Sequence, residues 1–323
     1  MRNVDLHSTP ADLQKLLNAK GWLGSGEEIQ SIAKAGEGNM NVVLRIQTNL
    51  RSFILKQSRP YVQKYQQIPA PLERISVEYQ FYSTVRGKAI DPYIPAIEAY
   101  DEEDYLMLME DLGTFEDMTS IYHTREISPK ALQQLISVLK AIHQADVPAT
   151  FPKNTALREL NHQHIFVLPF MEDNGFQLND IQEGLQELSM PFKKDIALKT
   201  VVNSLGEKYL SEGEVLIHGD YYPGSWMSNT EQVFVIDPEF SFRGFPEFDL
   251  GVMAAHLIMA SMDAESLNTL LHAYGPGLNS GMVGQIAGIE ILRRIIGLAQ
   301  LPLQRSIEEK AYLLTTARKL VLE

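Results

Sequence analysis

Three acidic residues, Asp220, Asp237 and Glu239, have the types and spacing for chemistry on a phosphate group. Val215–Ile217 is a short apolar run that predicts a buried strand, so Asp220 in the following His-Gly-Asp segment emerges on a loop. Clustered carboxylates repel one another unless a cation joins them, and hard oxygen ligands select Mg²⁺. Phosphoryl transfer needs a proton acceptor and metal ligands. We therefore interpret Asp220 as a candidate catalytic base, and Asp237 and Glu239 as candidate metal ligands.

Ser225 is a further candidate for the metal site. Trp226 and Met227, a polar turn and the apolar run 233–236 predict a β-hairpin. The residue that enters the first strand of such a hairpin lies opposite the residue that leaves the second. This pairing places Ser225 beside Asp237, where one ion can contact both.

The composition limits which kind of protein carries these residues. The chain has 323 residues, 45% of them hydrophobic, which is enough for two lobes with separate cores. It has no cysteine, which excludes disulfides and thiolate metal sites and fits a reducing compartment. The net charge of −13 argues against nucleic acid or an anionic membrane as a partner, and an anionic substrate would need a local basic patch.

The N-terminal sequence contains no apolar segment of the kind that directs export. Thr9, Pro10 and Asp12 instead predict the capped start of a helix. The most apolar internal stretch, 250–262, is too short to span a bilayer. We expect a cytoplasmic protein, and the sequence leaves open whether the chain forms a homodimer.

The first part of the chain, up to about Leu112, predicts a strand-rich lobe that binds nucleotide. A turn that contains Gly36, Gly38, Asn39 and Asn41 lies between two β-compatible runs, and its glycines allow backbone N–H groups to approach phosphates closely.

Lys56 and Glu78 form a predicted ion pair in this lobe. Lys56 ends the strand 52–56, and Glu78 lies on the apolar side of a helix predicted at about 72–85. A carboxylate on that side needs a cation, and Lys56 is the natural partner. Separate, solvated positions for the two charges remain the alternative.

The second part of the chain predicts a mainly helical lobe. The apolar strand 105–109 runs into a hinge at about 109–113, and helices are expected at 130–143, 181–188, 191–209 and 250–262. Asp249 is expected to brace the loop of Asp220 by accepting its backbone N–H groups. The predicted fold class is α+β, with domains at 1–112 (nucleotide binding) and 113–323 (catalysis and substrate binding).

The order of these motifs resembles the protein-kinase-like small-molecule kinases, the superfamily of aminoglycoside phosphotransferases and choline kinases. Within it, the chain looks most like the 5-methylthioribose kinases. The segments that carry this likeness are spread over most of the chain: LKQSRPYVQKY, RISVE, LMLMEDL, HQHIFVLPF, GSWM, VIDPEFSFRG, FDLG and LRRIIGLA.

The resemblance implies the fold and the role of each candidate. It implies a small β-rich N-lobe and a larger helical C-lobe, with ATP and Mg²⁺ bound between them. Lys56 would hold the α- and β-phosphates with Glu78 as its partner, and the turn at Gly36 would cover the phosphates. Backbone groups of Met109, Glu110 and Leu112 would receive adenine.

The resemblance also implies an acceptor site on the second lobe. Arg293 and Arg294 match a paired arginine that helps to bind the sugar in methylthioribose kinases, while a solvated helix face is the alternative interpretation of the pair. Asp220 would orient the attacking hydroxyl, and Tyr221 and Tyr222 lie beside it in sequence. The expected activity is transfer of the ATP γ-phosphoryl group to a hydroxyl of a small molecule, 5-methylthioribose or a related sugar.

The chain departs from the wider pattern in three ways. Ser225 stands where most kinases of this superfamily have asparagine, a change that methylthioribose kinases share. Tyr221-Tyr222-Pro223 replaces the usual Leu-His-Thr beside the acceptor hydroxyl, and the chain is short for a methylthioribose kinase, so other acceptors stay open. A sibling kinase that acts on another alcohol, an amino alcohol or an aminoglycoside remains an alternative. A nucleotide-binding pseudokinase is a third reading, against which Lys56, Asp220 and Asp237 speak together.

Overall fold

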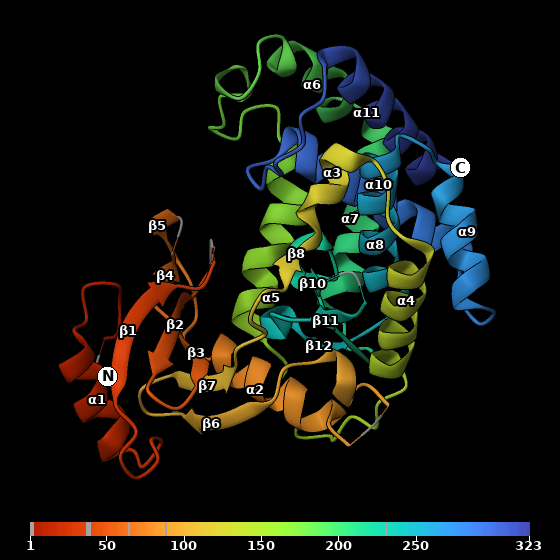
Figure 1. Cartoon of the computed structure of the whole chain (residues 1–323). Coiled ribbons are helices and arrows are strands. Elements are labelled where there is room, and N and C mark those ends of the chain that lie inside the picture. The colour runs from red at the N-terminus through yellow and green to blue at the C-terminus, as the bar shows by residue number, and fades with distance from the viewer. Residues whose placement is uncertain (1–2, 37–39, 64, 88, 230) are drawn as a thin grey trace.

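The structure is a computed structural model that describes residues 3–36, 40–63, 65–87, 89–229 and 231–323. It consists of a small β-rich lobe and a larger helical lobe (Figure 1). In sequence order, the smaller lobe contains α1 (Pro10–Ala19), β1 (Ile29–Lys34), β2 (Val42–Thr48), β3 (Ser52–Gln57), β4 (Tyr61–Val62), β5 (Tyr65–Pro69), α2 (Arg74–Val85), β6 (Ile97–Asp101) and β7 (Leu106–Glu110).

The sheet of the smaller lobe is antiparallel and has the strand order β1-β2-β3-β7-β6. Alternate residues of a strand face opposite sides of a sheet. Leu106 and Leu108 of β7 accordingly pack in a core with α1, whereas Met107 and Met109 pack in the other core with α2. The same alternation in β3 puts Lys56 on the α2 side, toward the second lobe.

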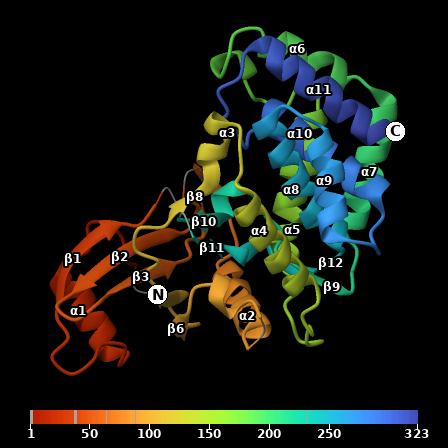
Figure 2. The ribbon, with the colours of Figure 1, turned by 45° about the vertical axis from the view of Figure 1, so that its right-hand side comes forward.

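The helical lobe contains the remaining elements. They are β8 (Glu116–Asp117), α3 (Ile121–Thr124), α4 (Pro129–His143), α5 (Thr155–His162), α6 (Leu185–Lys193), α7 (Ile196–Leu210), β9 (Val215–Ile217), β10 (Trp226–Ser228), β11 (Val233–Val235), η7 (Pro238–Phe240), β12 (Phe242–Gly244), α8 (Pro246–Ser261), α9 (Glu265–Tyr274), α10 (Ser280–Ile296) and α11 (Ile307–Leu322). Figure 2 shows α8 and α10 at the centre of this lobe, with α11 and α9 outside them.

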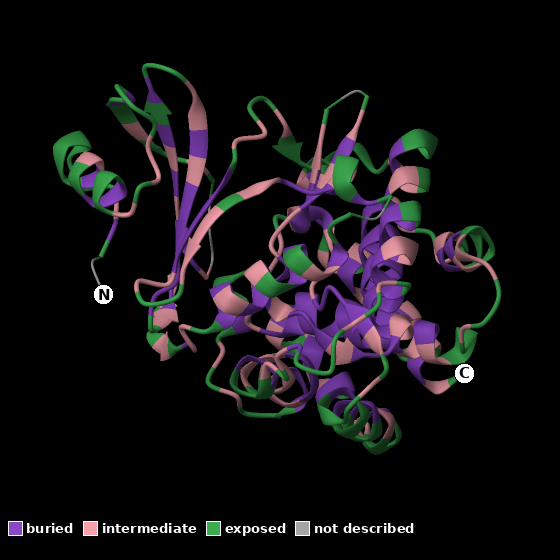
Figure 3. Ribbon diagram, turned by 90° about the horizontal axis from the view of Figure 1, so that it is seen from below, coloured by how far each residue is buried: buried purple, intermediate pink, exposed green. Residues whose placement is uncertain are grey.

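Burial is concentrated in the centre of the helical lobe (Figure 3). In α8, every residue from Phe248 to Ala260 is buried, and in α10 every residue from Ile286 to Ile296 is buried. Helices that are buried on all sides belong in the middle of a layered domain. Within the described residues, no helix combines the length and apolar character needed to cross a bilayer.

Several predicted elements are confirmed. Thr9 and Asp12 form a capping box at the start of α1. The strand at Val215–Ile217 and the hairpin of β10 and β11 are present.

Two helix predictions were wrong in their limits. The segment 181–188 is helical only from Leu185, and the predicted helix at 191–209 is two helices, α6 and α7. The break occurs because Asp195 caps a new helix by accepting the N–H of Leu198. Pro191 was expected near a helix start but lies inside α6.

Two glycines permit the close packing of α10. A Cβ atom on Gly251 of α8 would lie 2.6 Å from the Cβ of Ile286, and one on Gly288 of α10 would lie 2.4 Å from the carbonyl oxygen of Ala317 in α11. Only a residue without a side chain allows these helix backbones to approach so closely.

We predict that Gly288→Ala lowers the free energy of unfolding by about 1–3 kcal/mol, because the added methyl group must displace helix backbone. Gly281→Ala, near the exposed start of the same helix, is the matched control. Its Cβ would meet only ordinary contacts, so it should leave stability unchanged or raise it by up to about 1 kcal/mol. Chemical denaturation of both variants measures the difference, and equal effects would contradict this account of the packing.

Candidate active site

The loop of Asp220 is held from below by Asp249. The Asp249 carboxylate accepts the backbone N–H groups of His218 at 2.7 Å and Gly219 at 2.9 Å, as the sequence predicted. Gly219 has φ +84°, and a Cβ there would lie 2.2 Å from the carbonyl oxygen of Phe240. The loop therefore requires glycine at this position and a buried carboxylate beneath it.

His218 ties the same loop to the end of β11. Its Nε2 donates to the carbonyl oxygen of Ile236 at 3.0 Å, and its Nδ1 accepts the backbone N–H of Asp220 at 3.3 Å. Burial lowers the pKa of His218, which favours the neutral ring that this pattern needs. His218 thus fixes the backbone from which Asp220 projects.

The structure brings Asp220 together with the arginine pair. Its Oδ1 lies 3.4 Å from Nη2 of Arg294 and 3.8 Å from Nη2 of Arg293. Burial raises the pKa of Asp220 to about 6, although the two guanidinium groups act in the opposite direction. The arginines are buried, 5% and 8% exposed, so the alternative of a solvated helix face is wrong.

A buried network that the sequence analysis missed orients these arginines. Glu290 accepts Nε of Arg294 at 2.7 Å and also accepts Nε of Arg293. Although burial opposes ionisation, the two arginines hold the pKa of Glu290 well below its usual range. His256 lies 3.0 Å from Glu290, and its other ring nitrogen lies 2.6 Å from the hydroxyl of Tyr122. The spacing of Glu290 from the arginines, three and four residues along a helix, is a signal that could have found it.

Lys56 lies between acids from both lobes. Its Nζ is 2.6 Å from Glu78 Oε2, as predicted, and 2.5 Å from Asp237 Oδ1. Burial disfavours the charged amine, but Asp237 and Glu78 together raise the pKa of Lys56. The predicted ion pair is present, and the alternative of two solvated charges is wrong.

Glu239 lies in the short 3-10 helix η7, and Asp237 is the residue immediately before it. Asp237 has φ +60° and a side chain that is 47% exposed, whereas Glu239 is buried. Oε2 of Glu239 accepts Nδ2 of Asn41 at 2.8 Å and lies 3.3 Å from Nε of Arg74. The turn therefore presents Asp237 outward and anchors Glu239 to the first lobe.

Arg74 of α2 is a second residue that the sequence analysis missed. It is fully buried, and it donates to the carbonyl oxygen of Met40 and to Oδ1 of Asn41 as well as pairing with Glu239. Arg74 thus connects the end of the glycine-bearing turn to the acidic turn of the second lobe. It lies four residues before Glu78, one helical turn away, which places both side chains on one buried face.

The remaining nucleotide-site candidates occupy different environments. Gly36 is exposed with open space around it, while Gly38 and Asn39 lie outside the described residues. Asn41 is buried, and its amide holds Ser58, Arg74 and Glu239 in place.

The hinge candidates lie at and after the end of β7. Met109 is buried in the sheet, the backbone N–H of Glu110 donates to Ala96, and Leu112 is partly exposed where the chain crosses to the second lobe.

Three candidate residues follow Asp220 in the sequence, and two of them, Tyr222 and Ser225, lie close to the other candidate site residues. The ring of Tyr222 packs 4.8 Å below the guanidinium carbon of Arg294. The carbonyl of Ser225 accepts the N–H of Ile236, so Ser225 is next to the strand end that leads into Asp237.

The structure does not bring Tyr221 to the acceptor side. Its side chain is fully buried and its hydroxyl donates to the carbonyl oxygen of Leu135 at 2.8 Å. Its position after Asp220 in sequence suggested a contact with the acceptor, but successive residues of this loop point in different directions. Tyr221 packs the base of the loop.

The carboxylates of Asp237 and Glu239 meet some, but not all, of the requirements of a metal site. Among the described residues, no group of three or more acidic or histidine side chains has metal-binding geometry. Asp237 nevertheless offers a half-exposed carboxylate, and both partners of Glu239 within the described chain contact Oε2, which leaves Oε1 for an ion. Hard carboxylate oxygens of this kind suit Mg²⁺ better than a softer metal.

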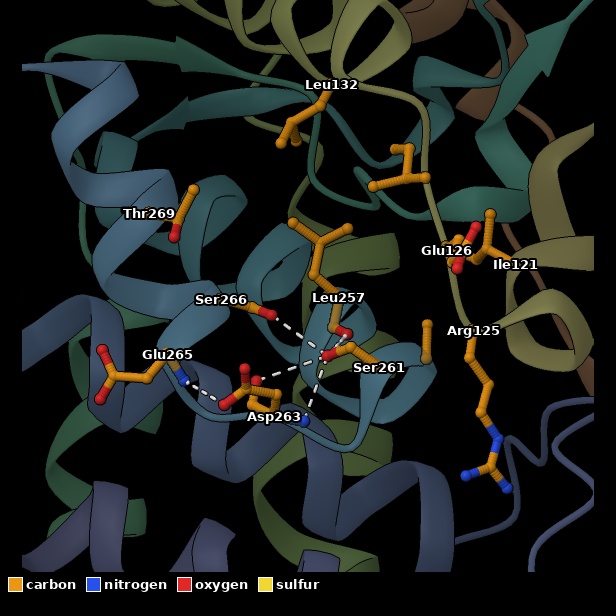
Figure 4. Close-up of a pocket in the computed structure, with 12 residues that line it drawn as sticks. Ile121, Arg125, Glu126, Leu132, Leu257, Ser261, Asp263, Glu265, Ser266 and Thr269 are labelled. Carbon is orange, nitrogen blue, oxygen red and sulfur yellow. Dashed lines mark hydrogen bonds between the residues drawn. The ribbon is translucent and has the colours of Figure 1, made fainter.

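A separate cavity of about 200 Å³ lies beside α3, α8 and α9 (Figure 4). Its hydrogen bonds are local: Ser261 bonds to Ser266 and to the backbone of Asp263. None of the predicted site residues lines it.

The two lobes and the site between them define a phosphotransferase fold of the protein-kinase-like type. Two solved structures share it. A spectinomycin phosphotransferase, solved with ADP and spectinomycin, has a TM-score of 0.55 and 14% identity over 97% of this chain and 99% of the other. Choline kinase LicA from Streptococcus pneumoniae has a TM-score of 0.54 and 13% identity over 96% and 98%. At these identities the likeness concerns the fold, and it confirms the α+β prediction.

The chain belongs to the phosphotransferase enzyme family known as APH, whose sequence model matches residues 31–282. Curated relatives include the methylthioribose kinase of Exiguobacterium sibiricum, 29% identical over 248 residues, or 73% of this chain and 63% of the relative. The methylthioribose kinase of Bacillus mycoides is 27% identical over 243 residues, or 71% and 61%. The match thus spans less than two thirds of the length of either relative.

We predict that Asp249→Asn lowers the free energy of unfolding by about 1–3 kcal/mol, because an amide has one acceptor oxygen and leaves one of two buried N–H groups without a partner. Asp146→Asn, at an exposed position, is the control and should change stability by less than about 0.5 kcal/mol. Denaturant unfolding compares the two variants. A loss no larger than that of the control would show that Asp249 does not hold the loop.

Proposed function

We propose that this protein is an ATP-dependent small-molecule kinase that transfers the γ-phosphoryl group to a sugar hydroxyl, with 5-methylthioribose or a related sugar as acceptor. The observation that carries the proposal is Asp220, a loop carboxylate with a raised pKa that faces two buried arginines. Membership of the phosphotransferase family and the methylthioribose kinase relatives support it.

On the nucleotide side, Lys56 binds the α- and β-phosphates. In the structure its amine already bridges Glu78 and Asp237, so it is charged and directed at the space between the lobes. Gly36, Gly38 and Asn39 cover the phosphates, and backbone groups of Met109, Glu110 and Leu112 receive adenine. Asn41 contributes indirectly, because its side-chain amide holds the carboxylate of Glu239 in place. The boundary between the two domains lies at Leu112.

Asp237 and Glu239 hold Mg²⁺, with Ser225 as a neighbouring oxygen. Asp237 supplies its exposed carboxylate and Glu239 the oxygen that Asn41 and Arg74 leave free. A bound magnesium ion offsets the negative charge of the phosphates. The positions of Arg74 and Asn41 keep Glu239 in place before the ion arrives.

On the acceptor side, Asp220 orients the attacking hydroxyl and accepts its proton as the new phosphate ester forms. Arg293 and Arg294 bind the acceptor next to Asp220, and Tyr222 supports Arg294 from below. Because little covalent chemistry is needed, alignment and charge compensation contribute most of the rate.

A sibling phosphotransferase for another alcohol is the second candidate function. The net charge of −13 would suit an amino alcohol or an aminoglycoside, but two guanidinium groups beside Asp220 disfavour a cationic acceptor. A screen of sugars, amino alcohols and aminoglycosides for acceptor-dependent release of ADP separates these candidates. No release with any acceptor would favour a pseudokinase.

A cytoplasmic location follows from the need for ATP, and cell fractionation would test it.

We predict that Asp220→Asn lowers turnover by about 10²–10⁴-fold, the range typical of removing a general base. ATP affinity should stay within about threefold, because Asp220 acts on the acceptor. Acceptor-dependent ADP release and equilibrium ATP binding are measured on the same preparations, with Asp146→Asn as the surface control. Turnover within threefold of the unmodified protein would remove Asp220 from the catalytic role.

We further predict an acidic limb in the pH dependence of kcat/KM. The pKa of Asp220 is raised to about 6, so the carboxylate is deprotonated above that pH and protonated below it. A protonated Asp220 cannot accept a proton, and activity should fall about tenfold per pH unit below 6. Rates at constant ionic strength with saturating Mg²⁺ test this. A limb centred near pH 4, the ordinary value for aspartate, would contradict the assignment.

A further inference from the structure

A second cavity, of about 300 Å³, has Arg294 in its wall, while Asp220 is not among its lining residues. Its walls are the loop that connects α10 to α11 and the segment before α6, which meet where Nε2 of Gln182 donates to the carbonyl oxygen of Arg305 at 3.3 Å. In Figure 1 these two segments form the upper end of the helical lobe.

The charged residues that line this cavity are all cations: Arg294, Arg305 and Lys310. Apolar side chains of Ile295 and Leu301 complete much of the wall. Arg294 is paired with Glu290 and Asp220, whereas Arg305 and Lys310 have no carboxylate partner among the described residues. The positive charge that these two residues bring to one small space favours an anion there. The rest of the protein has the opposite sign, with a net charge of −13.

Two of the three cations carry unpaired donors. Arg305 is 7% exposed, and its Nε is buried without a hydrogen-bond partner. Lys310 is 6% exposed, and its Nζ has no hydrogen-bond or ion-pair partner among the described residues. Burial lowers the pKa of Lys310. Buried donors are normally satisfied, and Nε of Arg305 is an exception. The ammonium group of Lys310 is unpaired without being fully enclosed, so it is open to an acceptor in the cavity.

The nearby acids are already engaged elsewhere. Glu309 pairs with Arg125 at 2.6 Å, and Glu290 accepts both arginines of the pair at their Nε atoms. Nη2 of Arg305 caps α8 by donating to the carbonyl oxygens of Met259 and Ala260, and Nη1 donates to the carbonyl oxygen of Gln304. Among the described residues, no carboxylate lines this space.

We propose that this cavity binds the carboxylate or phosphate group of a small molecule, with Arg294, Arg305 and Lys310 as its cationic donors. Arg294 lies between the cavity and Asp220, since its Nη2 is 3.4 Å from Asp220 and its Nη1 approaches the carbonyl of Ala299 in the cavity loop. The anionic group belongs either to the acceptor itself or to a separate small anion. The first case rests on the proposed kinase function and makes the acceptor a negatively charged sugar derivative.

Direct binding of inorganic phosphate tests the cavity without turnover. ADP is present throughout, so that the nucleotide phosphate site is filled. Lys310→Met removes the unpaired charge and keeps the aliphatic stem, and Lys310→Gln is a second variant. Lys319→Met, on the exposed face of the same helix, is the matched control. Phosphate should bind the intact protein and Lys319→Met equally, and Lys310→Met roughly tenfold or more weakly.

Thermal denaturation without phosphate reports folding of the variants. Since Lys310→Met removes only a charge that has no partner among the described residues, the variant should melt at or above the temperature of the intact protein. Phosphate should then raise the melting temperature of the intact protein and of Lys319→Met, but not of Lys310→Met. Equal phosphate binding in all variants, or none at millimolar concentration, would overturn the proposal.

Acceptor assays distinguish the two sources of the anion. Ribose is compared with ribose 5-phosphate, and glucose with gluconate, by ADP release. A charged acceptor that is preferred by the intact protein, with the preference lost in Lys310→Met, assigns the anion to the acceptor. Binding of phosphate that depends on Lys310, without a charge preference among acceptors, assigns it to a separate anion. Absence of ADP release with every acceptor would overturn the kinase proposal and leave the binding result standing.

Discussion

Burial of the charge on Lys56 is the interaction on which the rest of the site depends. A buried amine is stable only beside carboxylates, and those of Lys56 come from α2 and from the turn that begins at Asp237. Arg74 of the first lobe is likewise a buried cation, and it pairs with Glu239 of the second lobe. The two lobes are therefore joined by cations of the first and acids of the second, and these acids are the ones that suit a metal ion. In the proposed function, Asp237 would hold a metal ion and Lys56 would contact phosphate.

The second lobe uses the same principle to position Asp220. Asp249 and His218 fix the backbone of the loop, and the buried arginines face the carboxylate from α10. Glu290 holds the arginines at their Nε atoms and leaves their Nη groups directed at Asp220. Each charged group near the acceptor is thus oriented by a partner behind it, and such preorganisation lowers the cost of aligning a substrate.

Local patterns in the sequence predicted the parts of the site that depend on neighbours along the chain. The alternation of β3 and the helical spacing of Glu78 predicted their pairing. The hairpin was also predicted, but it pairs Trp226 with Val235, so Ser225 lies opposite Ile236 and not opposite Asp237 as expected. Partners from distant segments were not predictable: Glu290 with His256 and Tyr122, and Arg74 with Met40, meet only through tertiary packing. The helix break at Asp195 was missed because its cap competed with an otherwise continuous helical pattern.

Net charge and local charge lead to opposite expectations for the acceptor. The excess of acidic residues attracts cations at long range, but screening limits that effect to about 8 Å at physiological salt. Next to Asp220, Arg293 and Arg294 are paired with Glu290 as well as with Asp220, whereas Arg305 and Lys310 add positive charge that has no carboxylate partner among the described residues. Groups buried from water interact more strongly than exposed ones because less solvent screens them. We therefore propose that the few charged groups around Asp220 and the adjoining cavity, and not the net charge of the whole protein, select the acceptor.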